Sequence, residues 1–269
     1  MRLSQKIGTV LLLILLTISI LGPSLSGHAY DSIDLSAKNS PPGSRFFFGS
    51  DDLGRDVFTR TCIGVRISLL VGTVAALIDL FIGVSIGAFA ALSSKKTETL
   101  LMRIADGIYA MPYTLVVLFF LLALGPGLLS MLISLASIGW VTLARISLNQ
   151  FKVVSENDYV RYAKVQGATK GWILRKHLLP NSSRTIAAAM TMTVPTAIFS
   201  ESFLSFLGLG VQAPMASLGT MISESVSALE YYPWRIIPPL LAVALLILSF
   251  NLLAEINDEA RRSSNAHPA

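Results

Sequence analysis

Six predominantly apolar stretches alternate with polar segments along the chain. A helix needs about 20 consecutive apolar residues to cross the hydrocarbon core of a bilayer, and each stretch approaches or exceeds this length. The six predicted spans cover residues 7–25, 67–92, 100–124, 128–146, 185–207 and 234–253. The pattern predicts an all-α polytopic membrane protein with six transmembrane helices.

The first span, residues 7–25, follows Arg2 and Lys6, an arrangement that also fits a cleaved signal peptide. Its apolar run is longer than a usual signal core, and residues 26–29 make a poor cleavage site. We therefore interpret this span as a retained helix.

Basic residues gather in the segments that a model with a cytoplasmic amino terminus places inside the cell. Those segments contain Arg2, Lys6, Lys95, Lys96, the basic stretch 158–181, Arg261 and Arg262. The two later outer loops contain almost no Lys or Arg before Arg235. Cytoplasmic loops carry an excess of basic residues, so the charges predict that both termini are cytoplasmic.

Composition supports a membrane protein and excludes several other classes. Of 269 residues, 53% are hydrophobic and 14% charged, which is too apolar for a soluble domain of this length. The net charge of +5 is unevenly spread, which argues against nucleic acid as a partner. The single cysteine, Cys62, excludes an internal disulfide, and the three histidines are too far apart in sequence to suggest a metal site. No Walker A pattern occurs, so we expect any driving ATP to be bound by another chain.

Residues 158–181 read as a helix, a glycine hinge and a second short helix in the cytoplasm. A capping-box pattern at residues 155–158 opens the segment. Gly167 breaks the first helix, Thr169 caps the second and Pro180 ends it. Four residues recur at helical spacing and predict one exposed anchor face: Tyr159, Tyr162, Ala163 and Gln166.

The spacing of this loop resembles the coupling motif of permease subunits of ATP-binding-cassette (ABC) importers. Arg161-Tyr162-Ala163 occupies its Glu-Ala-Ala position, Gly167 its glycine, and His177-Leu178-Leu179-Pro180 its end. The Glu and the first Ala are missing, and His177 replaces Ile. The resemblance implies that the loop docks into a groove on an ATPase subunit. The alternative is an ordinary solvated basic loop.

Two further stretches are similar to the dipeptide, oligopeptide and nickel branch of these permeases, of the oligopeptide permease C type. One is residues 46–58, followed by residues 64–69; the other is residues 200–212, followed by Pro214 and Gly219. We expect the first to form an external segment whose charges face water and shape the outer mouth or a dock for a binding protein. Its candidate residues are Asp51, Asp52, Gly54, Arg55 and Asp56.

The resemblance implies a type I importer permease fold in the bacterial cytoplasmic membrane. It implies a second homologous permease, two ATPase subunits that bind ATP and Mg, and an extracytoplasmic substrate-binding protein, with no cofactor in this chain. The substrate class would be dipeptides, oligopeptides or nickel complexes. We divide the chain into an N-terminal helix and external segment at 1–66, a core domain at 67–258 with the coupling loop 147–184, and a tail at 259–269.

Five residues within the predicted spans are candidates for the transport pathway: Asp79, Asp106, Met111, Pro112 and Glu201. A carboxylate inside a membrane is costly, so Asp79 either lines a path or is a packing residue. Asp106 can pair with Arg103 on one helix face, and Met111-Pro112 is either a pathway bend or a packing kink. For Glu201 we favour a helix–helix contact over a pore-side carboxylate.

An ion-coupled secondary transporter is an alternative function, in which Asp79, Asp106 and Glu201 would form a relay. Such proteins usually contain internal repeats with broken helices in matching halves, and the sequence contains no convincing pair. A non-transporting membrane scaffold is a third possibility.

Overall fold

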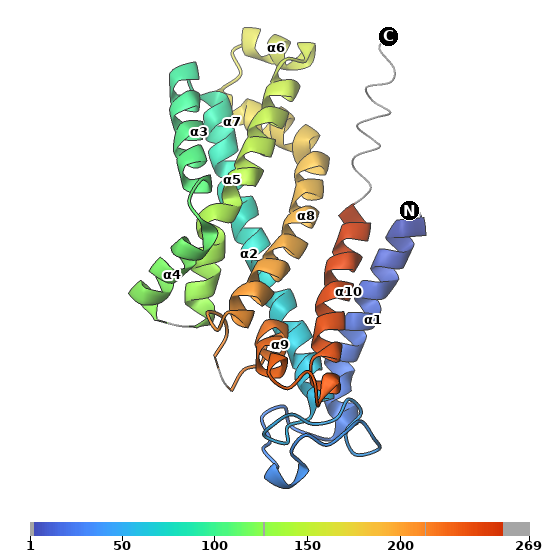
Figure 1. Cartoon of the computed structure of the whole chain (residues 1–269). Coiled ribbons are helices and arrows are strands. Elements are labelled where there is room, and N and C mark those ends of the chain that lie inside the picture. Colours follow the sequence, from blue (N-terminus) through green and yellow to red (C-terminus); the bar gives the residue numbers. More distant parts are fainter. Residues whose placement is uncertain (1–2, 126, 213, 255–269) are drawn as a thin grey trace.

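The computed structural model describes residues 3–125, 127–212 and 214–254, and the regular elements within these ranges are helices (Figure 1). Some residues used in the sequence predictions lie outside these ranges: Arg2, Arg261, Arg262, His267 and the predicted tail at 259–269. In chain order the elements are α1 Leu3–Ser26, η1 Leu35–Ala37, α2 Val57–Leu92, α3 Lys95–Tyr109, α4 Tyr113–Leu124, α5 Leu128–Ser155, α6 Asp158–Val165, α7 Lys170–Ile173, η2 Leu174–Leu178, α8 Leu179–Phe206, α9 Leu218–Val226, η3 Pro233–Arg235 and α10 Ile237–Ala254.

The 36-residue helix α2 is the centre of the bundle and packs against α5, α8, α1 and α10. Small residues let it approach its neighbours closely, as membrane helices require. A Cβ on Gly87 would lie 2.8 Å from the Ala144 carbonyl oxygen, and one on Gly72 would lie 2.4 Å from Ile198. The α2–α5 and α2–α8 contacts therefore depend on glycine at these positions.

Helix α1 packs against α2 and α10 rather than standing apart. The Arg66 guanidinium of α2 donates hydrogen bonds to the backbone carbonyls of Ser19 and Ile20, at 2.7 and 3.0 Å. Helix α1 is thus tied to α2 by polar as well as apolar contacts, and its retention in the mature protein stays a prediction.

Helices α2 and α5 extend furthest beyond their predicted spans, and helix α9 was not predicted. Helix α2 begins at Val57 rather than residue 67, because the Asp56 carboxylate accepts from the backbone N–H groups of Phe58 and Thr59 and caps it. Helix α5 continues past residue 146 to Ser155. Helix α9 lies within a segment predicted as an outer loop and is opened by a capping box between Ser217 and Thr220.

The third predicted span is broken into α3 and α4, which are bent by 83° at Ala110–Pro112. Proline has no N–H to donate and disfavours a helical conformation in the residue before it, so the chain turns at Met111. The predicted bend is confirmed, but it is too sharp for residues 100–124 to be one straight span. The predicted Arg103–Asp106 pair is wrong, because Asp106 pairs with Arg145 of α5.

Four helices of the described chain are long and apolar enough to cross a membrane, and five if α3 and α4 count as one span. They are α1, α2, α5 and the stretch containing α10. The predicted count of six is therefore not reached by length and apolar composition. The remaining long helix, α8, has 28 residues, but Thr185, Thr193 and Thr196 give it a polar face.

Replacement of Gly87 tests the α2–α5 contact. We expect Gly87→Ala to lower the free energy of unfolding by about 1–3 kcal/mol, because the new methyl group collides with the α5 backbone. Thermal unfolding of the purified chain in detergent measures the effect. Gly107→Ala is the matched control, because a Cβ on Gly107 meets nothing within 4 Å; equal midpoints for the two variants would contradict the packing argument.

Candidate functional site

The predicted cytoplasmic helix is present as α6, at one end of the molecule and opposite the external segment 28–56 (Figure 1). Val160 and Ala163 face inward and are buried, whereas Tyr159 and Tyr162 are 45% and 70% exposed. The inclusion of Ala163 in the anchor face is therefore wrong, because it lies one turn from Val160 on the inner side. Val165, 87% exposed, was missed by the sequence analysis.

Gly167 ends α6 in the left-handed conformation that the sequence predicted, with a φ of 84°. The Gly167 N–H donates to the Lys164 carbonyl, and the Ala168 N–H donates to the Ala163 carbonyl, both at 3.0 Å. This pair of bonds is a Schellman motif, which needs a residue that adopts positive φ easily. The hinge therefore has a defined geometry.

The start of α6 differs from the prediction. Asn157 is the residue before the helix and makes no side-chain capping bond, and the Ser155 hydroxyl donates to the Lys152 carbonyl instead. The predicted capping box is wrong because α5 extends to Ser155 and uses that residue in its own last turn. The first turn of α6 still has the favourable negative charge of Asp158.

His177, which replaces the Ile of the coupling motif, lies between two aromatic side chains. Its ring centroid is 5.5 Å from that of Tyr159 and 5.1 Å from that of Trp172. Both aromatic partners are about half exposed. The contacts join α6 to the following helical segment, and Arg161 is exposed on the same helix.

Beyond Gly167 the chain forms one continuous helical run from Lys170 to Phe206 through α7, η2 and α8. Thr169 caps it as predicted, accepting from the Trp172 N–H. Pro180 does not end the second helix: Leu174–Leu178 is a π-helical turn in which the Leu179 N–H donates to the Leu174 carbonyl. The missing N–H of Pro180 falls directly after this turn, at the start of α8, where the helix tolerates it.

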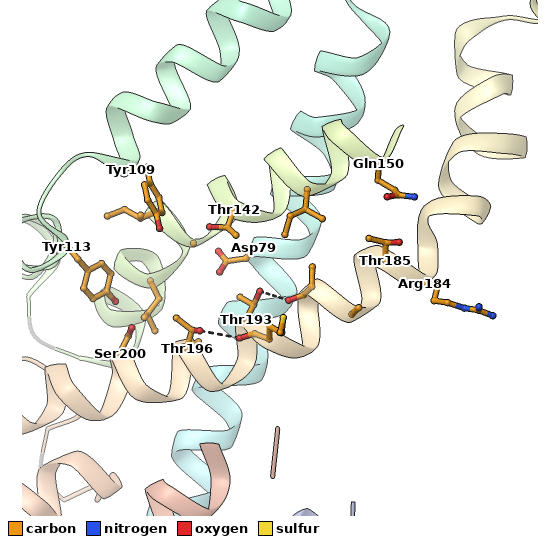
Figure 2. Close-up of a pocket in the computed structure, with 18 of the residues that line it drawn as sticks. Asp79, Tyr109, Tyr113, Thr142, Gln150, Arg184, Thr185, Thr193, Thr196 and Ser200 are labelled. Carbon is orange, nitrogen blue, oxygen red and sulfur yellow. Dashed lines mark hydrogen bonds between the residues drawn. The ribbon is translucent and has the colours of Figure 1, made fainter. Parts of the chain in front are cut away.

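A cleft of about 950 Å³ lies beside α8 and is lined by residues of α2, α3, α4, α5 and α8 (Figure 2). Tyr109 and Tyr113 lie toward one end of it, and Gln150 and Arg184 toward the other. The Asp79 carboxylate lies between these ends, and Asp79 is 3% exposed. Asp79 is thus the pathway candidate that the structure places in the cleft wall.

The other pathway candidates lie elsewhere. Glu201 is fully buried and accepts hydrogen bonds from Ser68 of α2 at 2.7 Å and Ser205 at 2.8 Å, so it joins α2 to α8. This is the helix–helix contact that the sequence analysis favoured. Asp106 is an exposed partner of Arg145, and Met111 and Pro112 are exposed at the bend outside the cleft lining. Asp79, Asp106 and Glu201 thus occupy three different environments, which does not support a relay.

The charges of the external segment do not all face water, contrary to the sequence expectation. Asp51, Arg55 and Asp56 are each less than 10% exposed. The Asp51 carboxylate accepts from the Arg55 Nε at 2.6 Å, and Arg55 also donates to Glu224 of α9 at 3.0 Å. Opposite charges compensate one another here, which makes their burial tolerable.

Three residues of this network were not selected from the sequence: Arg60, Glu224 and Arg235. Arg60, only 2% exposed, donates to Glu224 at 2.9 Å, and Arg235 donates to Asp52 at 3.0 Å. The network therefore connects the start of α2 to α9 and to η3. Its sequence signal was the presence of arginines at the margins of otherwise apolar segments.

Gly54 is tightly enclosed within the same segment. Its φ is 74°, and a Cβ there would lie 1.8 Å from the Asp34 carbonyl oxygen. The Asp34 side chain is partly exposed, and its pKa is lowered by the Ser36 hydroxyl, which donates to it, and by the Arg45 guanidinium. The loop is thus held both by backbone fit and by surface polar contacts.

Comparison with known proteins identifies the family to which this chain belongs. Residues 83–263 match the family described as binding-protein-dependent transport system inner membrane component. The chain belongs to this family. It is therefore the membrane permease subunit of an ABC importer, a multi-pass protein of the inner membrane.

Two curated relatives from Bacillus subtilis (strain 168) cover most of the permease. It is 39% identical over 249 residues to the oligopeptide transport system permease protein OppC, which covers 93% of this chain and 82% of the relative. It is 44% identical to the dipeptide transport system permease protein DppC over 92% of this chain and 78% of the relative.

A solved structure has the same fold. A chain of the MetNI methionine ABC transporter in an inward-facing conformation aligns with this permease with a TM-score of 0.62 and 17% sequence identity. The alignment covers 76% of this permease and 95% of that chain. The likeness confirms the expected type I importer permease fold.

Replacement of Arg55 tests the buried outer network of the permease. We expect Arg55→Ala to lower the free energy of unfolding by about 3 kcal/mol, because it leaves the buried Asp51 carboxylate without its closest partner. Arg45→Ala is the matched control, since its pair with Asp34 is exposed and worth at most about 1 kcal/mol. Thermal unfolding in detergent measures both, and an Arg55→Ala midpoint as high as that of Arg45→Ala would contradict the network's structural role.

Proposed function

We propose that this permease imports dipeptides or oligopeptides, and that it converts ATP-driven movement of its cytoplasmic loop into opening and closing of the cleft. It would act with a second homologous permease, two ATPase subunits that bind ATP and Mg, and an extracytoplasmic substrate-binding protein. The names of the two Bacillus relatives support the peptide class. The family description supports the binding protein as a partner.

The observation that carries the proposal is the uninterrupted helical run from Lys170 to Phe206. Near its start, the His177 ring contacts the Tyr159 ring of α6, and its later turns, from Arg184 to Ser200, form one wall of the cleft. A helix transmits displacement along its axis because its backbone bonds are internal. A movement of α6 would therefore displace the cleft wall, as alternating access requires.

The exposed side of α6 supports docking of an ATPase subunit. Tyr159, Tyr162 and Val165 project from it while Val160 and Ala163 anchor it to the permease. Exposed aromatic residues on a short helix are suited to insertion in a groove of a partner. Arg161 stands where the coupling motif has an acid, so the partner groove would have to accept a cation at this position.

The external segment is proposed as the surface that meets the binding protein. Its charged network fixes the backbone, and several large apolar side chains remain available for contact beside exposed charged ones such as Arg45. Phe47, Leu35 and Tyr231 are 52%, 67% and 70% exposed on this side of the chain. We assign to Asp51, Arg55 and Asp56 the support of this surface rather than direct contact.

Gly167→Val and Tyr162→Asp test the coupling proposal. Valine resists the positive φ at the hinge, and aspartate replaces the exposed ring with a charge. We expect each variant to insert in the membrane but to lose most ATP-dependent uptake in proteoliposomes that contain the full importer. ATPase retention and substrate-stimulated hydrolysis are measured in parallel.

Gly171→Val is the matched control for the hinge. A Cβ on Gly171 meets nothing within 4 Å, and Gly171 has no positive φ. We expect this variant to remain coupled. If Gly167→Val and Tyr162→Asp both transport normally, the loop is not the transmission element.

Labelling of single cysteines tests the proposed orientation, with α6 cytoplasmic and residues 28–56 outside. In intact spheroplasts, a membrane-impermeant maleimide should label Ser44→Cys but should label Lys164→Cys only after permeabilisation. The native Cys62 is buried at 3% exposure and serves as the background. Labelling of Lys164→Cys in intact spheroplasts would contradict the proposed orientation and place α6 outside the cell.

A further inference from the structure

The cleft contains a buried carboxylate that the coupling mechanism does not use. We propose that Asp79 binds the protonated amino group of the transported peptide as it passes through the permease. This inference rests on the proposed peptide substrate and adds a specificity-determining residue in the membrane subunit itself.

Asp79 has no partner within the described chain that would explain its presence. It is 3% exposed, and its Oδ1 atom is buried without a hydrogen bond. None of the ion pairs found among residues 3–125, 127–212 and 214–254 includes it. An uncompensated carboxylate within a membrane is costly, so its place in a cleft wall points to a ligand of opposite charge.

Glu201, the other buried carboxylate among the long helices, differs from Asp79 in its hydrogen bonding. Glu201 accepts hydrogen bonds from Ser68 and Ser205, so its polarity is satisfied inside the bundle. Asp79 has no such donors from α5 or α8, although both helices pass beside it. The two acids differ in role because one is satisfied by helix packing and the other is not.

The backbone of α5 fixes the position of the carboxylate. A Cβ on Gly139 would lie 2.0 Å from Asp79 Oδ2, so the side chain packs directly onto the glycine. Gly139 is itself part of the cleft wall. The contact restricts the carboxylate on the α5 side and leaves the cleft as the space from which a ligand can approach.

The side chains described below, which lie near Asp79, do not form hydrogen bonds or ion pairs with its carboxylate. The hydroxyls of Thr193 and Thr196 donate to carbonyls of their own helix (Figure 2). The buried Tyr113 hydroxyl lies near Ser200 but forms no hydrogen bond. Arg145 lies over the Tyr109 ring and pairs with Asp106.

The remaining charged residue of the cleft lining, Arg184, lies toward one end, and its side chain extends away from Asp79 (Figure 2). It leaves the central carboxylate available.

The ligand chemistry follows from one carboxylate in a roomy, mostly uncharged cleft. An ammonium group offers three donors and a full positive charge, which form strong hydrogen bonds with a carboxylate. A metal ion would need several oxygen ligands, and no suitable group of acidic or histidine side chains occurs among the described residues. A cleft of about 950 Å³ accommodates a short peptide whose side chains vary while its amino group stays constant.

The test compares trialanine with N-acetyl-trialanine, which lacks the ammonium group. Binding of each peptide is measured on the purified permease–ATPase complex without the binding protein, and uptake is measured in proteoliposomes with it. We expect Asp79→Asn to weaken trialanine binding by about tenfold, equivalent to about 1.4 kcal/mol. Binding of N-acetyl-trialanine should be the same for wild type and variant, and Asp79→Glu should restore part of the preference.

Glu230→Gln makes the same chemical change at an exposed outer position and should bind both peptides as the wild type does. Equal trialanine affinity for Asp79→Asn and the wild type overturns the inference. Equal weakening of both peptides also overturns it, because this would indicate a structural role. If the wild-type importer takes up neither peptide, the proposed function fails as well, whereas normal peptide uptake by Asp79→Asn overturns this inference alone.

Discussion

The close contact of α2 with α5 and α8 is the constraint on which the rest of the structure depends. Lipid offers no hydrophobic force between helices, so association in the membrane relies on close packing and on a few polar bonds. Glycines on α2 provide the packing, and the Ser68–Glu201 hydrogen bond provides a polar link to α8. With α2 held in this way, α5 and α8 supply most of the cleft lining, and α2 contributes Asp79 to it.

The loop that contains α6 is joined to this core through Gly167 and the π-helical turn that follows it. The turn at Gly167 is set by its positive φ and by two backbone hydrogen bonds, and Val160 of α6 packs against α5 and the helical segment after the turn. The π-turn at Leu174–Leu178 then lets the chain pass Pro180 without a break and continue into α8. The same helical run therefore reaches from its contact with α6 to the lining of the cleft.

Buried charged residues of this permease occur in two different environments, one with counter-charges and one without. At the end of the molecule formed by residues 28–56, Asp51, Arg55, Arg60 and Glu224 neutralise one another and hold α9 against the start of α2. In the cleft, Asp79 is left without a counter-charge. The first arrangement stabilises the fold, while the second is costly and suits a ligand-binding role.

Much of the fold could be read from local features of the sequence, because apolar length, glycine and proline act through their immediate neighbours. Apolar periodicity located the long helices, Pro112 indicated the bend between α3 and α4, and the spacing around Gly167 identified α6 and its hinge. The tertiary structure alone decided which side chains face inward. It turned Ala163 toward the bundle, brought Arg55 and Arg60 to the distant Glu224, and separated the satisfied Glu201 from the unpaired Asp79. These outcomes depend on contacts between residues far apart in the chain, which no local pattern specifies.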